Sequence, residues 1–522
     1  MIQVIVASLL LLVLAAVLRV VPLWLSPSGA GIDHWFWKAY IEEFRRSGRF
    51  PPSLPQYVLD EEQWYPPVFP LVLAFLPSAL FDRWNRAVAI AIDLVRMLLL
   101  LAVAYWQSDG NPAVVALAGL LYATTPIQIS YNIQLNPRGL AALILDVVLI
   151  LLLVQMSGSE LWWIWGVIGL LSGVVLLTHK MTTQLFWFVI LGTAVIYRHW
   201  WLLALIPASL LSAMILSGGF YWKVLRAHWD IVSFWHKHWP WIGADLIRES
   251  PIYGDSKYER PEKLHQSGWR GFFWHWIVLL GFGPAAWIAC LLTYERLTGS
   301  PFLIYPTPLL VWLLLPCLFA VLTTFVAPLK CLGAGYLYVY NTSVLASLVL
   351  ALTFQYTRAP WLSTPVVVLA LALNVAGVLA YYRQFHRSKR ARVQDELEEV
   401  IDRLREMPRG VVMCVPANWY EVVAYKTGQP VLWGGHGYGF RRLEPTWPRF
   451  LIPFSEIVRR YNVRYLITME GMLTPAVAAE IPSAVRVCKG NYQLYCFQND
   501  PAVAHVQWKG GANDPNHAFS NP

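Results

Sequence analysis

The chain is dominated by a series of apolar stretches, most of them about as long as a membrane is thick. A helix needs about 20 apolar residues to cross the hydrocarbon core of a bilayer. The stretches lie at 2–24, 88–106, 112–127, 139–155, 161–178, 181–197, 200–217, 272–293, 303–327, 336–354 and 361–382. They predict a polytopic α-helical membrane protein with about eleven transmembrane helices. Only 14% of the residues are charged, against roughly 25% in soluble domains, which excludes an ordinary soluble enzyme.

Two of the apolar segments need a separate interpretation. Residues 2–24 are interrupted by Arg19 near their end and lack a small-residue cleavage site, so we expect a retained first span and not a signal peptide. The segment from Tyr65 to Phe81 begins Tyr-Pro-Pro and is shorter than a full span. We expect it to form a non-spanning helix, re-entrant or interfacial.

Two long polar loops, 25–66 and 218–271, separate the spans and are the places where function is expected. The first carries acidic and basic residues beside Trp35, and the second sets tryptophans among histidines, including Trp235 and His236. Such rings anchor a protein at the membrane interface or stack on sugars. Both explanations fit the second loop.

The composition changes after Tyr382, where a basic cluster at 383–392 is followed by an amphipathic helical pattern. From Gly410, short β-rich runs alternate with helical stretches at 418–427, 454–461 and 474–480. This rhythm predicts a small soluble α/β domain over 383–499, closed by a hairpin, with a disordered tail at 500–522. An odd number of spans places the domain and both loops outside the cytoplasm, whereas the basic cluster favours the cytoplasm.

Net charge and cysteine content restrict the partners. The net charge of +9 comes from basic residues in loops and the C-terminal part, which favours anionic headgroups or phosphates over nucleic acid. The six cysteines form no CxxC pair or zinc-type spacing. Cys488 and Cys496 flank the expected hairpin turn and are candidates for a disulfide in an oxidising compartment.

Asp33 is the first candidate for chemistry. It follows the first span directly, in the segment Gly-Ile-Asp-His-Trp at 31–35. A carboxylate at the mouth of a membrane cavity, walled by aromatic rings, has the surroundings of a general base with a shifted pKa. An N-cap of the helix that begins at His34 explains the same residue type equally well.

The order of these features resembles the GT-C superfamily of integral-membrane glycosyltransferases, closest to its protein mannosyltransferase and aminoarabinose transferase branch. The resemblance rests on the acid after the first span, the amphipathic loop from Ala39 to Gly48, and Tyr-Pro-Pro-Val-Phe-Pro at 65–70. Leu-Leu-Thr-His-Lys at 176–180 is similar to the branch's Leu-Thr-Lys segment, and Gly-Tyr-Leu at 335–337 weakly resembles its Arg-Tyr-Leu segment. The resemblance covers residues 1–382, and the α/β domain also looks like the extracytoplasmic domains that follow this core.

The resemblance implies a transferase of the inner or plasma membrane. Its donor would be a polyprenyl-phosphate or polyprenyl-pyrophosphate sugar, and its acceptor a glycan, lipid or protein outside the cytoplasm. Transfer would invert the anomeric carbon, with Asp33 as the base. The stretch at 131–138 lacks the acid that members often carry there, which disfavours a two-acid metal site. No cofactor is firmly implied.

The remaining site candidates are basic, histidine and aromatic residues. Arg138, Lys180 and His179 lie where apolar helices meet polar loops, which suits contact with the donor phosphate. Snorkelling to headgroups explains either cation alone, and a lone histidine is more often structural. Acceptor or sugar contacts are expected from His34, Trp35, Tyr65, Trp235 and His236. The α/β domain is expected to shape acceptor access.

These features predict an inverting membrane glycosyltransferase that uses a lipid-phosphate sugar donor. A transporter or flippase of lipid-linked glycans is the alternative, because polar residues at membrane depth also mark translocation pathways. A transporter is expected to show internal repeats, and the sequence shows no convincing one.

Overall fold

A computed structural model describes most of the chain. The described residues are 2–25, 32–59, 61–238, 307–356, 360–387, 390–415, 417–434, 439–447, 450–469, 472–473, 475–481 and 485–497, with isolated positions at 285, 288–289 and 291–292. Apart from those isolated positions, the predicted span at 272–293 therefore lies outside the described residues. The part of the second polar loop that follows His238 and the predicted tail at 500–522 lie outside them as well.

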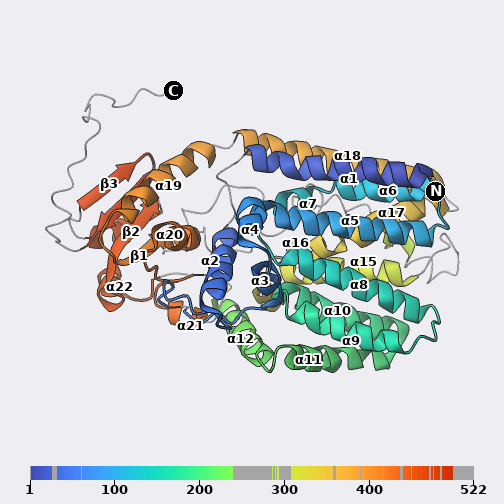
Figure 1. Ribbon diagram of the computed structural model, residues 1–522, viewed down its shortest axis with the longest axis horizontal. Coiled ribbons are helices and arrows are strands. Elements are labelled where there is room, and N and C mark those ends of the chain that lie inside the picture. Colours follow the sequence, from blue (N-terminus) through green and yellow to red (C-terminus); the bar gives the residue numbers. More distant parts are fainter. Residues whose placement is uncertain are drawn as a thin grey trace.

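The fold is that of a polytopic helical membrane protein, as predicted. Within the described ranges, seven helical segments are long and apolar enough to cross a membrane. They are Ile2–Leu25 (α1), Ser78–Gln107 (α4, Ser78–Trp84, and α5, Val88–Gln107), Arg138–Met156 (α8), Lys180–Tyr197 (α10), Thr307–Phe325 (α15), Tyr336–Tyr356 (α16, Tyr336–Val339, and α17, Ser343–Tyr356) and Ser363–Arg383 within α18 (Pro360–Arg387). Shorter apolar helices form at Pro112–Ala123 (α6), Trp163–Leu176 (α9) and Leu205–Leu216 (α11). Figure 1 shows them as one bundle.

The segment predicted to be non-spanning contains a short helix. Helix α3 (Val68–Ala74) has seven residues and is about 10 Å long, far less than the roughly 30 Å of the hydrocarbon core. The predicted end at Phe81 is wrong, however. Phe81 belongs to α4, which continues through one 3-10 turn into α5, because no proline or glycine interrupts the chain between Ser78 and Gln107.

Two ion pairs tie the bundle together from inside. Arg19 of α1 pairs with Asp93 of α5, whose other carboxylate oxygen accepts a hydrogen bond from Tyr122 of α6 at 2.7 Å. The Nε of Arg96, also on α5, lies 2.8 Å from Asp146 of α8. The four charged side chains are almost completely buried. At such depth charges are tolerated only when they are paired.

Two further helices lie between the bundle and the C-terminal part (Figure 1). They are α2 (Ile32–Ser47) and α12 (Tyr221–His238). On α12 the buried residues Tyr221, Val224, Ile231 and Phe234 recur at helical spacing, so one face is packed while Trp222 and Trp229 remain exposed on the other. These two helices bring polar residues of both predicted loops to the end of the bundle.

The C-terminal part is an α/β unit, as predicted. It comprises α19 (Arg390–Arg405), β1 (Val411–Val415), α20 (Tyr420–Thr427), α21 (Phe440–Leu443), α22 (Phe454–Arg460), β2 (Val463–Met469), α23 (Pro475–Glu480), β3 (Val485–Lys489) and β4 (Tyr492–Cys496). The sheet has the order β1-β2-β4-β3, with β1 parallel to β2 and with β4 antiparallel to both β2 and β3. The predicted helices at 418–427, 454–461 and 474–480 correspond to α20, α22 and α23.

The strand register does not fit the candidate disulfide between Cys488 and Cys496. The β3–β4 hairpin pairs Cys488 with Gln493 and Cys496 with Val485. The two cysteines are therefore offset by three positions along the strands, about 10 Å, whereas a disulfide requires Cα atoms within about 7 Å. Cys496 is a free, buried thiol.

Candidate active site

The candidate site lies where the first turns of α2, α8 and α10 meet the segment before α3. The backbone N–H of Val68 donates to the carbonyl of Leu177 at 2.9 Å, which fixes the Tyr-Pro-Pro segment against the start of α10. As a result, Lys180 Nζ lies 4.6 Å from the centroid of the Tyr65 ring. Two motifs that are 115 residues apart in the sequence thus form one wall.

Asp33 lies in the first turn of α2 and is half-buried. Its charge acts on Tyr65 and on His179, and Arg138 acts on the same two residues. The structure therefore brings Asp33 together with Tyr65, His179 and Arg138. A carboxylate at this position, near the N-terminus of a helix, is favoured electrostatically.

Arg138 is the first residue of α8 and is only 8% exposed. Its backbone N–H donates to Asn136 Oδ1 at 2.8 Å, and its guanidinium carbon lies 5.1 Å from the Tyr131 ring centroid and 5.8 Å from that of Tyr340. Its Nε and Nη1 are buried and have no hydrogen-bond partner in the described part of the chain. A buried guanidinium with unused donors is costly and is suited to an anion such as phosphate.

His179 caps the start of α10. Its Nδ1 accepts from the backbone N–H of Thr182 at 3.3 Å and lies 2.9 Å from Thr182 Oγ1. Because Nδ1 accepts, the proton is assigned to Nε2. Burial, and then the charge of Arg138, lowers the pKa of His179 well below its usual range. His179 is therefore a neutral ring whose Nε2–H is the group that could donate to a ligand.

The other predicted residues of the first loop lie among aromatic rings, with His34 buried and Trp35 partly exposed. His34 is 3% exposed, and burial, reinforced by Arg86 and Lys38, lowers its pKa to about 3. Trp35 contacts the Tyr425 ring at 5.3 Å, and Lys426 Nζ lies 4.8 Å from the Trp35 ring. Trp35 therefore packs α2 against α20, and its contact with a sugar stays a prediction.

Tyr65 lies deeper in the same wall. Its ring is packed edge-on against Trp37 at 4.9 Å. Burial, and then the charge of Asp33, raises the pKa of the Tyr65 phenol, so the hydroxyl is protonated at neutral pH.

The residues predicted on α12 make no hydrogen bond, ion pair or ring contact with this wall among the described residues. His236 is exposed, and the Trp235 ring contacts Phe440 of α21 at 6.3 Å. Two other histidines of α12, His228 and His238, make polar contacts with residues outside this helix. His238 Nε2 lies 2.9 Å from Glu444, and His228 Nε2 lies 2.7 Å from Gln184 of α10.

Several polar residues of the site do not stand out in the sequence. Tyr131 donates to Tyr336 at 2.8 Å, Tyr340 donates to Asn132 at 2.9 Å, and Tyr338 donates to Gln184 at 2.5 Å. Their only signal is a cluster of tyrosines within an apolar segment. Gly335 allows this cluster to form, because a Cβ there would collide with the backbone of Ala320.

No metal-ligand set is apparent among the described residues. Groups of three or more His, Cys, Asp or Glu side chains able to hold one ion do not occur in that part of the chain.

Comparison with solved structures supports the architecture. No family model and no curated protein matches the chain. The apo oligosaccharyltransferase of Archaeoglobus fulgidus matches with a TM-score of 0.54 at 12% identity, over 89% of this chain and 69% of that one. ArnT from Cupriavidus metallidurans bound to undecaprenyl phosphate matches with a TM-score of 0.53 at 12% identity, over 95% and 98%. Apo ArnT matches with a TM-score of 0.55 at 11% identity, over 94% and 97%. The chain has the GT-C fold that its sequence predicts.

Proposed function

We propose that this protein is an inverting glycosyltransferase that moves a sugar from a polyprenyl-phosphate-linked donor to an envelope acceptor. The observation that carries the proposal is the buried Arg138 guanidinium, whose Nε and Nη1 have no partner in the described part of the chain. It lies in one cluster with Asp33, Lys180 and His179. A lipid-linked phosphate at the end of the bundle would supply the missing acceptors.

In the proposed reaction Asp33 accepts the proton of an acceptor hydroxyl. The acceptor oxygen forms a bond to the anomeric carbon on the face opposite the phosphate, and the carbon–phosphate-oxygen bond breaks. The electron pair of that bond leaves with the polyprenyl phosphate, so the configuration inverts. Arg138 and Lys180 stabilise the negative charge as it develops, and His179 donates from Nε2. A metal is not required for this balance of charge.

The fold neighbours support the class of donor. ArnT was solved with undecaprenyl phosphate, and the A. fulgidus enzyme was solved with dolichol-phosphate and an inhibitory peptide. Both ligands combine a long isoprenoid chain with a phosphate. The described bundle could bind both parts of such a ligand. Its apolar helices suit the isoprenoid chain, and the basic, partly buried cluster at one end suits the phosphate.

We also propose the placement of the domains. Residues 1–382 form the transmembrane catalytic domain, and 383–499 form an extracytoplasmic domain. Tyr425 of α20 donates to Glu42 of α2 at 2.7 Å, so the α/β unit contacts the helix that carries Asp33. This contact supports the proposal that the unit and the site share one side of the membrane, the side of the envelope acceptor.

The test is replacement of Asp33 by asparagine. Purified wild-type protein, incubated with radiolabelled polyprenyl-phosphate sugars and an envelope extract as acceptor, is expected to release polyprenyl phosphate. Asp33→Asn should still bind the donor but release at least about 100-fold less, since general-base catalysis contributes about 10²–10⁴. Glu43→Gln is the matched control on the same helix, because Glu43 pairs with the exposed Arg46.

Two results would contradict the proposal. Ordinary release by Asp33→Asn would remove Asp33 as the base. Movement of the intact lipid-linked sugar across proteoliposomes by the wild type, without release of polyprenyl phosphate, would instead identify a flippase.

A further inference from the structure

The interior of the bundle contains a second arginine next to Arg138. The guanidinium carbons of Arg96 and Arg138 lie 5.4 Å and 5.8 Å from the centroid of the same Tyr340 ring, so they are no more than about 11 Å apart. Tyr340 is 1% exposed, and its hydroxyl donates to Asn132 Oδ1 at 2.9 Å. One anchored ring thus contacts both cations.

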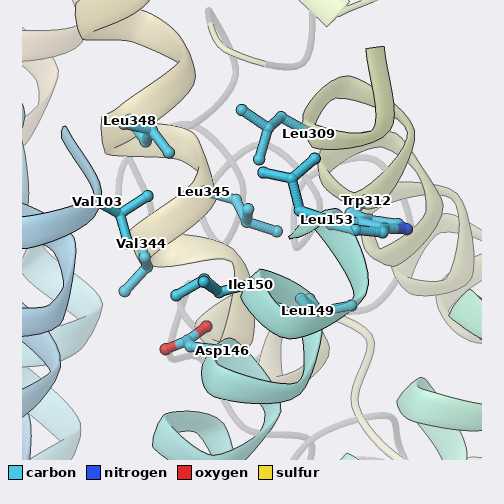
Figure 2. Close-up of a pocket in the computed structure, with 10 residues that line it drawn as sticks. All are labelled: Val103, Asp146, Leu149, Ile150, Leu153, Leu309, Trp312, Val344, Leu345 and Leu348. Atoms are coloured by element: carbon cyan, nitrogen blue, oxygen red, sulfur yellow. The ribbon is translucent and has the colours of Figure 1, made fainter. Parts of the chain in front are cut away.

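The two arginines differ in their counter-ions. The charge of Arg96 is balanced by Asp146, at 2.8 Å from its Nε. Figure 2 shows Asp146 at the end of a small cavity whose other lining side chains are apolar, among them Trp312 and Leu345. A carboxylate in such surroundings is stable as an anion only beside its arginine. Arg138 has no carboxylate beside it in the salt bridges of the described residues. Both arginines keep two buried donors without a hydrogen-bond partner in that part of the chain, Nη1 and Nη2 of Arg96 and Nε and Nη1 of Arg138.

We propose that Tyr340 and the Arg96–Asp146 pair are positioning residues for the donor phosphate, acting through Arg138; this rests on the proposed function. The Tyr340 ring holds the Arg138 guanidinium from one side while Tyr131 contacts it at 5.1 Å, which leaves Nε and Nη1 for the ligand. The ion pair supports Tyr340 without adding net charge. Arg138 therefore binds the phosphate tightly enough for catalysis and still releases the polyprenyl phosphate product.

This arrangement predicts opposite effects for two kinds of substitution. Tyr340→Leu removes the cation–π contact and should weaken binding of undecaprenyl phosphate about three- to thirty-fold, and Tyr340→Phe, which keeps the ring, should restore most of it. Asp146→Asn leaves Arg96 charged and unbalanced. If the phosphate at Arg138 also lies roughly 11 Å from Arg96, this unit charge at an effective dielectric constant of about 20 should tighten binding about tenfold. The kcat should fall because product leaves more slowly.

A role in folding alone does not predict tighter binding. Undecaprenyl phosphate binding to detergent-purified protein is measured by tryptophan fluorescence, with kcat and KM measured on the same samples. The double variant Arg96→Met/Asp146→Leu removes both charges and should return the affinity to within about threefold of wild type. Thr193→Val is the matched control, because it removes a buried hydrogen bond from Trp312 of 3.1 Å about 20 Å along α10 from Lys180.

The outcomes separate this inference from the function on which it rests. If wild type and Arg138→Met bind undecaprenyl phosphate equally, the proposed phosphate site itself is wrong. Weak binding by Arg138→Met would support the phosphate site. If, in addition, Asp146→Asn binds no more tightly than wild type and Tyr340→Leu binds like wild type, only the positioning role is overturned. Should Asp146→Asn fail to fold, the comparison of Tyr340→Leu with Tyr340→Phe decides alone.

Discussion

Replacing Arg138 by methionine should separate activity from stability. In the free protein this guanidinium is buried, and its Nε and Nη1 have no partners within the described ranges. Each unsatisfied buried donor costs about 1–3 kcal/mol. A methionine of similar length has no such donors and packs well in irregular apolar space. The free energy of unfolding of Arg138→Met should therefore equal or exceed that of wild type.

The same substitution should be severe for catalysis. Hydrogen bonds to charged groups contribute about 1.5–3 kcal/mol each, so two bonds from Nε and Nη1 to a phosphate amount to about 3–6 kcal/mol. At about 1.4 kcal/mol for each factor of ten, kcat/KM should fall by roughly 10²–10⁴. Arg138→Lys keeps the charge but loses the planar pair of donors, and we expect an intermediate loss.

The assay combines thermal unfolding in detergent with release of labelled polyprenyl phosphate. Arg198→Met is the matched control, because Arg198 lies at the far end of α10, and it should leave kcat/KM unchanged. A lowered unfolding midpoint of Arg138→Met together with near-normal kcat/KM would refute the reasoning. That result would mean that Arg138 is a structural cation that snorkels to headgroups.

Two further predictions concern pH. Because burial lowers the pKa of His34 to about 3, the unfolded chain takes up a proton below pH 6.5 that the folded chain does not. The free energy of unfolding should fall by about 1.4 kcal/mol per pH unit from 6.5 toward 3, and His34→Gln should reduce this slope in unfolding titrations, whereas the exposed His236→Gln should not. The pKa of Glu444 is lowered, first by its hydrogen bond from Lys237 and also by that from His238. The contribution of Glu444 to docking of α21 on α12 is therefore present above about pH 4.5 and lost as the pH falls below that value. Cleavage of wild type by pepsin near 440–447 should therefore increase below about pH 4.5. In Glu444→Gln the cleavage should depend less on pH.

The sequence predicted those parts of the fold and the site that have a local signal. Spans follow from apolar length, and Asp33, Arg138 and Lys180 attract notice because charged residues are rare beside apolar helices. The structure brings these three into one cluster, although Arg138 and Lys180 belong to different helices. Arg138 and Lys180 come together because each is the first residue of its helix and the two helices begin at the same end of the bundle.

The missed residues have no local signal of this kind. Tyr340 and Gln184 lie within largely apolar helical segments, where a tyrosine or glutamine is usual in a packed core. Their importance comes from neighbours about 150 to 210 positions away in the sequence, which no periodicity reveals. Trp35 and Trp235 drew attention through their aromatic character, which suggested sugar contacts. The structure adds that both rings pack against the α/β unit, and their contact with a sugar stays a prediction.

Those packing contacts explain how the α/β unit takes part in the proposed reaction without contributing a catalytic group. Helix α2 places Asp33 in its first turn, and two residues later Trp35 is held by Tyr425 and Lys426 of α20. A third contact, from Tyr425 to Glu42, fixes the rotation of the helix about its axis. The docked domain therefore holds the helix that carries Asp33, which the proposed role of Asp33 requires, because a general base has to be positioned within a fraction of an ångström.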